Sequence, residues 1–516
     1  MNNWDRIDLL KAMKNSVHHL LKAVILFLGI FVAINDVYAG PGVGRSGRWF
    51  TYNDQPTYLV GFDAQQLAAD PAIDITAVLD KFSEFRINKI RVWTYCWFLG
   101  DAGYTPWQKI NGVHNLDAWD DAVYWPRMRL LAAEARARKI VVEVTIFAPY
   151  PNTTNYWWDL PKFKNAWNKD FNSNSAFSSF NGKGHFYPEF YDLNYDERSS
   201  RGKSLRFYQQ ALVDKVVLEL GKFDNVYFEI ANEFAVDGYG GPKNAIIDNP
   251  QLRLWQDNWV QRINTQTSRL ISVHSDTDGL GQGTPIWNGN RLIDILNFRL
   301  PNATPNDISN ILRNSGAQSG NKILTINETD GGRGKSYYHD LDLHTRYAWG
   351  MFLSGGHIAF YQDDSSRILT DPGWEMGANR LRVLRDIAES VRFWEMSPVN
   401  PKDGSEYDSL ITQGPAEDWQ VLATPGSQYV VYFWGKKLST NAEINLPTGS
   451  YRYDWYDVHN KKLLGKGTVT GGGNTVIASP SIDSWQGNSG LALVIKDNNK
   501  KLTELTDYHE HLVLIP

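Results

Sequence analysis

The feature that most constrains the fold of this chain is a repeated alternation of short apolar runs with amphipathic helical patterns. The apolar runs lie at residues 57–63, 89–95, 140–147, 225–233, 271–276, 294–300, 322–328 and 357–363. Helical patterns are expected between and after them, at about 75–85, 119–138, 203–222, 250–270, 305–314, 339–354 and 374–395. Eight strands that alternate with helices predict an α/β protein, a (β/α)₈ TIM barrel over residues 40–398.

A doubly wound open sheet is the competing fold for such an alternation. That fold commonly carries a G-x-G-x-x-G turn after its first strand, where a dinucleotide binds. No such turn follows the run at 57–63. The sequence therefore favours the closed barrel.

The character of the chain changes after "SPVNPKDG" at residues 397–404. Short aromatic and β-branched runs follow, such as "QYVVYFWG" at 428–435 and "LALVIK" at 491–496, with Gly, Pro and Asn between them. This pattern predicts a small all-β sandwich at 399–498. The last residues, 499–516, are expected to form a loosely ordered tail.

The N-terminus has the pattern of an export signal. Lys11, Lys14 and Lys22 precede the apolar run 23–34, and the small-x-small sequence 37–39 follows it. The run is short for a bilayer span and suits the core of a signal peptide, which predicts a signal over residues 1–39. An uncleaved N-terminal anchor is the alternative, and no stable membrane partner is expected unless the segment stays uncleaved. Either way the chain is expected to be periplasmic or extracellular.

Composition excludes several classes of function. The net charge is −5, and no Lys/Arg-dense stretch lies beyond the N-terminus, which argues against nucleic acid as a partner. Cys96 is the single cysteine, so intrachain disulfides and Cys-based zinc sites are excluded. No H-E-x-x-H motif or clustered His/Asp set implies a metal, and no cofactor is expected. Aromatic residues make up 13%, with 20 Trp and 25 Tyr, which suits sugar binding and protein interfaces alike.

Catalytic side chains of a TIM barrel lie at the carboxyl ends of its strands. Here Glu233 and Glu328 close the fourth and seventh apolar runs, three strands apart round the ring. Two carboxyl groups that face each other across a pocket are what glycoside hydrolysis requires, one as acid and one as nucleophile or base. Further candidates for substrate contact stand at other strand ends or in the long loop after the third run: Asp63, Arg91, Trp93, Trp158, His274 and Tyr361.

Three of these runs carry a family resemblance. "NVYFEIANE" resembles the fourth-strand signature of clan A retaining glycoside hydrolases, the cellulase, mannanase and β-galactosidase type. "ILTINE" resembles the seventh strand of that clan, and "KIRVW" its second strand. The resemblance follows the strand order from about 57 to 398.

The resemblance implies a role for each matching residue. Glu233 would be the general acid/base and Glu328 the nucleophile. Asn232 would hold the sugar 2-hydroxyl, and Arg91 would keep Glu328 ionised, since a nearby cation lowers the pKa of a carboxyl group. The implied substrate is a carbohydrate with β-type linkages, cleaved with retention of anomeric configuration.

The chain departs from the clan pattern on two strands. Many members have a Tyr on the sixth strand, where this chain reads Asn297-Phe298-Arg299, and a Trp on the eighth, where the counterpart is Tyr361. We expect His274 and Tyr361 to take over those contacts. The C-terminal stretches "YRYDWYDVHNKKLL" and "SPSIDSWQGNSGLALVIK" resemble a β-sandwich named as a collagen-binding domain in bacterial glycosidases; a brace or a sugar-contacting accessory domain is the expected role.

Two inner carboxylates are expected to be scaffold. Glu229 lies four residues before Glu233, one layer deeper in the barrel, and is predicted to be a buried support paired with an arginine such as Arg91. Glu143 is predicted to be a similar interior residue. Asp330 competes with Glu328 for the nucleophile role.

Two other function classes stay open at this point. One is a non-catalytic glycan- or matrix-binding protein on a barrel scaffold, since fold does not fix function. The other is a metal-dependent amidohydrolase, which the missing His ligands on the first strand disfavour. The sugar, the linkage, endo or exo action and the oligomeric state do not follow from the sequence.

Overall fold

The structure is a computed structural model of the chain. It describes residues 42–94, 103–110, 113–147, 193–194, 202–232, 250–276, 290–299, 308, 322–328, 341–361, 365–399, 410–437, 441–459, 462–480 and 490–499. Two compact units divide the chain, residues 1–42 and residues 43–516. Every helix and strand named below belongs to the second unit.

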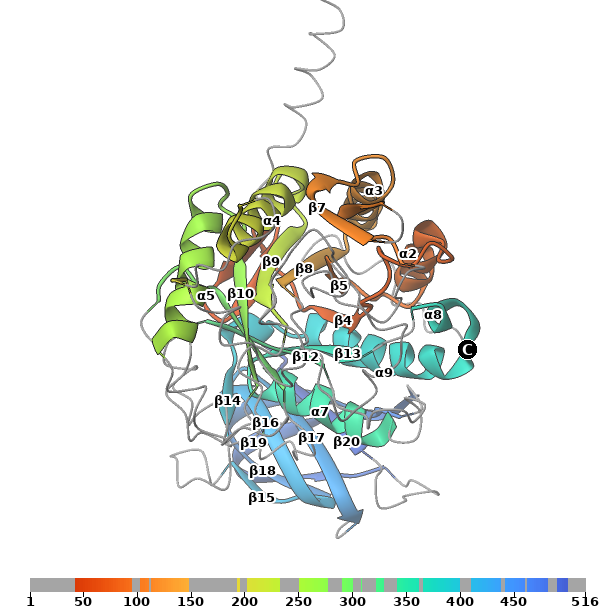
Figure 1. Ribbon diagram of the computed structural model, residues 1–516. Helices are drawn as coiled ribbons and strands as arrows, with labels where there is room; N and C mark the ends of the chain where they lie inside the picture. The colour runs from red at the N-terminus through yellow and green to blue at the C-terminus, as the bar shows by residue number, and fades with distance from the viewer. Residues whose placement is uncertain are drawn as a thin grey trace, which may run out of the picture. The chain divides into compact units, whose positions relative to one another are not determined.

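Eight parallel strands form a closed barrel in the order β4-β5-β8-β9-β10-β11-β12-β13 (Figure 1). The strands are β4 (Val60–Asp63), β5 (Lys89–Trp93), β8 (Val141–Phe147), β9 (Val226–Ala231), β10 (Ile271–Asp276), β11 (Ile295–Arg299), β12 (Ile323–Glu328) and β13 (His357–Tyr361). Each lies within one of the eight predicted runs. The predicted TIM barrel is confirmed.

Helices follow the strands of the barrel, as predicted. They are α2 (Ile75–Glu84), α3 (Tyr124–Ala137), α4 (Leu205–Leu220), α5 (Pro250–Asn264), α7 (Leu341–Leu353), α8 (Arg367–Thr370), α9 (Pro372–Glu389) and η6 (Phe393–Glu395). Side-chain caps begin three of them: Asp74 accepts from the N–H of Ala77, Ser204 from that of Phe207, and Asp371 from that of Gly373. Of the helix expected at 305–314 the structure describes Ile308 alone.

The two faces of a barrel strand are both buried but differ in chemistry. On β5, Ile90 and Val92 belong to the large apolar core that the helices share. Lys89 and Arg91 alternate with them and point into the barrel interior. The interior of this barrel is therefore polar and charged, whereas branched apolar side chains usually fill such interiors.

A small N-terminal sheet covers the amino ends of the barrel strands. It consists of β1 (Val43–Ser46), β2 (Trp49–Tyr52) and β3 (Gln55–Pro56), which the sequence did not predict. Phe50 packs on Tyr227 and His357, with ring centroids 5.8 and 4.8 Å apart. Burial lowers the pKa of His357 to about 3, so the ring is neutral and accepts the N–H of Leu59 at Nδ1. This end of the barrel is closed by apolar packing.

A second unpredicted hairpin follows β5. It pairs β6 (Trp107–Ile110) with β7 (Val113–Trp119), and the rings of Trp107 and Trp119 stack at 6.2 Å. Because it lies in a βα loop, it belongs to the end of the barrel where the strand ends meet.

The C-terminal strands form an antiparallel sheet, in agreement with the predicted sandwich. Its order is β14-β16-β17-β20-β18-β15, and β19 pairs with β18. The strands are β14 (Ser397–Val399), β15 (Ile411–Gln413), β16 (Ala416–Thr424), β17 (Gln428–Lys437), β18 (Asn441–Asp457), β19 (Lys462–Ala478) and β20 (Gly490–Asp497).

Both faces of β17 are buried, which explains its continuous apolar sequence. Tyr429, Val431 and Phe433 belong to a core within the sheet domain. Val430, Tyr432 and Trp434 alternate with them and belong to the core of the barrel and its helices. Trp349 of α7 stacks on Tyr432, with centroids 5.1 Å apart and ring planes at 16°. The sheet is therefore packed against the barrel helices as a brace, one of the two roles expected for it.

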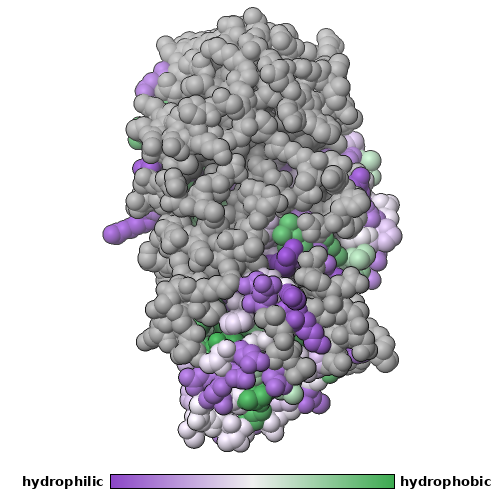
Figure 2. All heavy atoms as spheres, turned by 90° about the horizontal axis from the view of Figure 1, so that it is seen from below, coloured by the Kyte–Doolittle hydropathy of each residue, from purple (hydrophilic) through white to green (hydrophobic). Residues whose placement is uncertain are grey.

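Among the described residues, the exposed large apolar side chains come from separate elements, such as Leu218 of α4, Leu254 of α5 and Met376 of α9. On the face shown in Figure 2, hydrophilic and hydrophobic residues are interspersed, and the hydrophobic ones form small separate groups. Within the described ranges, no helix is both long and apolar enough to span a membrane. The apolar run 23–34 lies outside those ranges.

We predict that Trp349→Ala lowers the free energy of unfolding by about 3–5 kcal/mol, because it removes a buried ring from the contact between α7 and β17. Urea denaturation followed by fluorescence measures the change. Leu218→Ala on α4 is the matched control, since Leu218 is 71% exposed and should cost no more than about 0.5 kcal/mol. A Trp349 variant as stable as this control would contradict the bracing role.

Candidate active site

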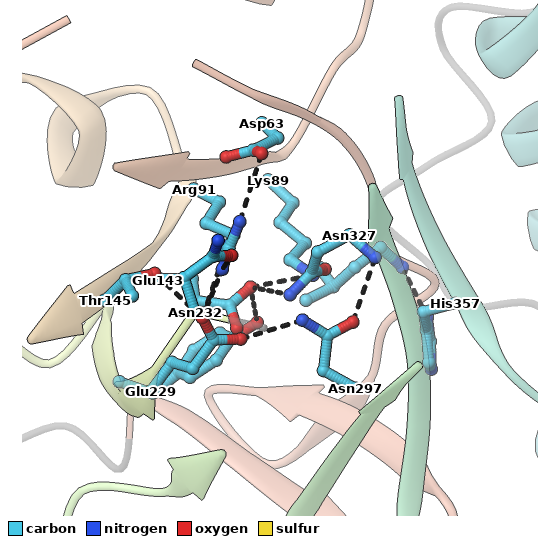
Figure 3. A network of polar contacts seen from close by, with 12 residues as sticks. Asp63, Lys89, Arg91, Glu143, Thr145, Glu229, Asn232, Asn297, Asn327 and His357 are labelled. Atoms are coloured by element: carbon cyan, nitrogen blue, oxygen red, sulfur yellow. Dashed lines mark hydrogen bonds and ion pairs between the residues drawn. The ribbon is translucent and has the colours of Figure 1, made fainter. Parts of the chain in front are cut away.

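A hydrogen-bonded network of charged side chains fills the barrel interior below the strand ends (Figure 3). Five of its members are charged residue types, and all five are 0% exposed: Asp63, Lys89, Arg91, Glu143 and Glu229. They come from neighbouring strands β4, β5, β8 and β9. Buried charges are tolerated only when they are paired and hydrogen-bonded, so this network is built as a unit.

Arg91 is the hub of the upper part of the network. Its guanidinium donates to Glu229 from both Nε, at 3.1 Å, and Nη2, and it donates from Nη1 to Asp63 Oδ2 at 3.0 Å. Nη2 also donates to Asn232 Oδ1 at 2.6 Å. A planar guanidinium holds several acceptors in fixed directions, so Arg91 fixes the end of β9 relative to β4 and β5.

Glu229 is a buried scaffold residue paired with Arg91, as predicted. It also accepts from Thr145 Oγ1 at 2.9 Å through Oε1, and from Asn297 Nδ2 at 2.7 Å through Oε2. Donors from β5, β8 and β11 thus meet on one carboxylate of β9. These contacts hold the carboxylate in one position in the barrel interior.

A second ion pair lies beside the first. Lys89 Nζ is 3.1 Å from Glu143 Oε2 and also donates to Asn327 Oδ1. Glu143 Oε2 accepts from Tyr227 at 2.8 Å and from Asn327 Nδ2 at 2.7 Å. Burial raises the pKa of Glu143 and lowers that of Lys89, while the attraction between the two opposes both shifts. The interior role predicted for Glu143 is confirmed.

Asp63 ends β4 beside this network and titrates near neutral pH. Burial raises its pKa to about 7, against the lowering effects of Arg91 and of the hydrogen bond from Gln65 at 2.9 Å. Its second oxygen, Oδ1, has no hydrogen-bond partner among the described residues. A buried carboxyl group that titrates near pH 7 at a strand end is typical of a functional site.

The structure brings several predicted residues together at the strand ends. Asn232 follows β9 directly and reaches Arg91, and the guanidinium carbon of Arg91 lies 5.8 Å from the centre of the Trp93 ring. His274 is buried on β10, in register with Asn297 of β11. Tyr361, in register with Asp63, is half-buried at the end of β13.

Other predicted residues fall outside what the structure describes. Glu233, Trp158, Asp330 and Cys96 lie in undescribed segments, and for Glu328 the structure describes the backbone, which ends β12. The expected support of Glu328 by Arg91 therefore stays a prediction. Within the described ranges, no group of three or more His, Cys, Asp or Glu side chains is arranged to hold a metal ion.

Sequence reasoning did not single out Lys89, Thr145, Tyr227 and Asn327 of the network, and it noted Asn297 on the sixth strand without giving it a role. The one signal for them is parity, because polar residues at alternate positions of an otherwise apolar barrel strand point to its interior. For Asn327 parity is a weaker guide, because the register between β12 and β11 shifts at this residue. Phe298 pairs with Ile326 and Arg299 with Glu328, which leaves Asn327 as an extra residue, a β-bulge.

Comparison with known proteins shows a shared fold. No family model matches the chain. A protein of Oryza sativa subsp. japonica named "Putative mannan endo-1,4-beta-mannosidase 9" is 34% identical over 122 residues, which are 23% of this chain and 28% of that protein. The chain thus matches little more than a quarter of the length of this curated relative.

Solved structures match over most of the chain. A glycoside hydrolase family 5 protein from Bacteroides vulgatus has a TM-score of 0.60 at 12% identity, over 89% of this chain and 94% of that one. A second structure, described as a glycoside hydrolase, has a TM-score of 0.57 at 14% identity, over 89% and 97%. Both alignments cover more of the chain than the barrel comprises. The barrel and the C-terminal sheet therefore share the fold of these glycoside hydrolases, in agreement with the clan A resemblance.

Asp63 should make stability depend on pH. The unfolded chain releases this proton near pH 4. The folded protein holds it to a pH of about 7. The stabilisation from this proton is therefore full below about pH 4 and is lost as the pH rises toward about 7. We expect the free energy of unfolding of the wild type, measured by urea denaturation relative to Asp63→Asn, to fall across this window. Parallel pH curves for the two proteins would contradict the shift.

Proposed function

We propose that this chain is an exported glycoside hydrolase that cleaves β-linked sugars with retention, with Glu233 as general acid/base and Glu328 as nucleophile. The observation that carries the proposal is that one buried network holds the ends of β9 and β12, the two strands that lead into these glutamates. The glutamates directly follow Asn232 and Asn327, and both asparagines are tied into the same buried network. The fold shared with glycoside hydrolases supports the assignment.

Hydrogen bonds hold the chain in place at the end of β9, directly before Glu233. Asn232 is 3% exposed, its N–H donates to the carbonyl of Phe147 at 2.8 Å, and its side chain accepts from Arg91. Both bonds anchor the residue directly before Glu233. A catalytic acid needs such anchoring because catalysis depends on near-attack geometry.

The β-bulge in β12 sets the register of Glu328 relative to β11. Without it, Glu328 would share the parity of Leu324 and Ile326, which belong to the apolar core of the helices. With it, the backbone of Glu328 is level with residue 299, two residues beyond Asn297, whose side chain lies in the barrel interior. The register therefore favours a nucleophile at this position.

The proposed reaction has two balanced steps. Glu328 attacks the anomeric carbon while Glu233 gives its proton to the leaving glycosidic oxygen, and the C–O bond breaks to give a glycosyl ester of Glu328. Water then attacks the same carbon and gives a proton to Glu233, and Glu328 leaves as a carboxylate. Retention requires the two carboxyl groups to lie roughly 5–5.5 Å apart.

Mannan is the first substrate to test, since the rice relative is named for an endo-1,4-β-mannosidase. The purified protein should release reducing sugar from at least one β-linked polysaccharide of a panel that includes β-1,4-mannan. Binding of a polysaccharide without any product would instead favour the non-catalytic class.

We propose export on the basis of the N-terminal pattern. The lysines before residue 23, the apolar run 23–34 and the small-x-small sequence at 37–39 together support a signal peptide, and hence a periplasmic or extracellular site of action. A polysaccharide substrate is consistent with that location.

Glu328→Ala should lower the turnover of an activated aryl β-glycoside by about 10³-fold or more, because no glycosyl-enzyme forms without the nucleophile. Steady-state kinetics measures the loss. Glu84→Ala is the matched control, since Glu84 is exposed at the end of α2. Near-wild-type turnover in Glu328→Ala would remove the nucleophile assignment, as would an inverted product in an NMR time course.

Glu233→Ala should discriminate between leaving groups. The first step should be almost unaffected for an aryl leaving group that needs no proton, and strongly slowed for a sugar leaving group that does. Pre-steady-state rates on a matched pair of substrates measure the difference. An equal loss on both substrates would argue against an acid role.

A further inference from the structure

Asn297 occupies a central place in the barrel interior. It lies in β11 with 0% exposure, between His274 of β10 and Thr325 of β12 in the register of the sheet. In Figure 3 its side chain points across the interior toward Glu229 and the backbone of Asn327. Residues that commonly support the site on this strand in the resembled clan are replaced here, so the role of Asn297 has to be read from its contacts.

The side-chain amide of Asn297 joins two strands that are not neighbours. Nδ2 donates to Glu229 Oε2 of β9 at 2.7 Å, and Oδ1 accepts the main-chain N–H of Asn327 on β12 at 3.0 Å. An ionised carboxylate only accepts and a main-chain N–H only donates, so the two contacts require one donor and one acceptor on a short side chain. Asparagine meets this requirement at neutral pH, whereas Asp, Leu and Ala do not.

The Asn327 N–H is an unusual partner because it belongs to the bulge. A bulge residue is left out of the regular ladder, and its backbone groups need other partners. Here the side chain of Asn297 supplies one, while Lys89 and Glu143 hold the side chain of Asn327. The position of the bulge therefore depends on these contacts.

We propose that Asn297 is a positioning residue that holds the end of β12 at a fixed distance from the end of β9. A continuous chain of hydrogen bonds runs from Asn232 through Arg91, Glu229 and Asn297 to the main chain of Asn327. Residues 233 and 328 are the next residues beyond its two ends. The inference rests on the proposed function, because it assigns the purpose of this link to the spacing of the two carboxyl groups.

Spacing matters because misplacement of reacting groups by about 1 Å can cost about 10²-fold in rate. Asn297→Ala removes both hydrogen bonds and leaves the Asn327 N–H without its partner. We expect kcat to fall about 10²-fold with KM changed less than about twofold, since Asn297 itself lies below the strand ends and the loss concerns chemistry more than binding.

Asn88 provides a matched control. It is another buried asparagine, 4% exposed, that accepts a main-chain N–H, that of Val60 at 2.9 Å, and donates to a carbonyl, that of Tyr58 at 2.9 Å. It lies at the amino end of β5, away from the strand ends. Asn88→Ala should lose stability as Asn297→Ala does and keep the wild-type kcat. Equal falls of kcat in the two variants would reduce Asn297 to a general structural role and overturn the proposal.

The pH dependence of kcat in Asn297→Asp tests whether the hydrogen-bond donor to Glu229 is needed. The carboxylate of this variant still accepts the Asn327 N–H but repels Glu229, and burial beside a like charge raises the pKa of the pair. Protonation restores the donor, so the ratio of variant to wild-type kcat should rise as the pH falls from 8 to 5. The same ratio for Asn297→Ala should stay flat, because no titration restores its hydrogen bonds. A flat ratio for Asn297→Asp would overturn the proposal.

Hydrogen–deuterium exchange separates this inference from the proposed function. Exchange in the peptide that covers residues 323–328 should be faster in Asn297→Ala than in the wild type and unchanged in Asn88→Ala. If exchange in Asn297→Ala is unchanged, Asn297 does not hold β12 in place. That result overturns the proposed link, whatever hydrolytic activity is measured. A wild type that hydrolyses no β-linked substrate overturns the proposed function, and with it the purpose assigned to the link, even where exchange shows that the link exists.

Discussion

The ion pair between Arg91 and Glu229 is the interaction on which the rest of the barrel interior depends. Both side chains are wholly buried, and each holds further groups: Arg91 holds Asp63 and Asn232, and Glu229 holds Thr145 and Asn297. Removing one partner of a buried pair leaves an uncompensated charge, which costs about 3–5 kcal/mol. A barrel filled with aliphatic side chains would avoid this cost. The charged interior instead connects the strand ends above it through directed hydrogen bonds.

Apolar packing closes the amino end of the barrel and joins the C-terminal sheet to its helices. Apolar packing of Phe50 closes the amino end, so the charged network can open toward the carboxyl ends of the strands alone. The sheet packs one face of β17 on the barrel core through Tyr432 and Trp349. Because both faces of β17 are buried over most of its length, this strand has little surface left for a ligand. Bracing of the barrel is therefore the role that its contacts support.

Much of the fold follows from the sequence, because a strand or helix of the barrel is set by local periodicity. All eight barrel strands coincide with predicted apolar runs, and Glu229 was predicted as a buried partner of an arginine from its position four residues before Glu233. The hairpins β1–β2 and β6–β7 were missed. Strands β1, β2 and β6 have four residues each, so they show little periodicity, and short hairpins owe their stability to the surfaces they cover. Asn297 and Asn327 were missed as site residues because their partners are 68 and 184 positions away in the sequence.

The sequence by itself determined the class of fold and the order of the strands, since each of these is a local pattern of residue types, and the same patterns predict carboxylates at the fourth and seventh strand ends. Tertiary structure alone decided which charge pairs with which, that burial raises the pKa of Asp63 to about 7, and that Asn327 forms a bulge that moves Glu328 into the register of residue 299. The physical reason is that a buried charge and a bulge are stabilised by groups from other strands. Their energies depend on which side chains the closed barrel brings within hydrogen-bond distance, and no local stretch of sequence contains that information.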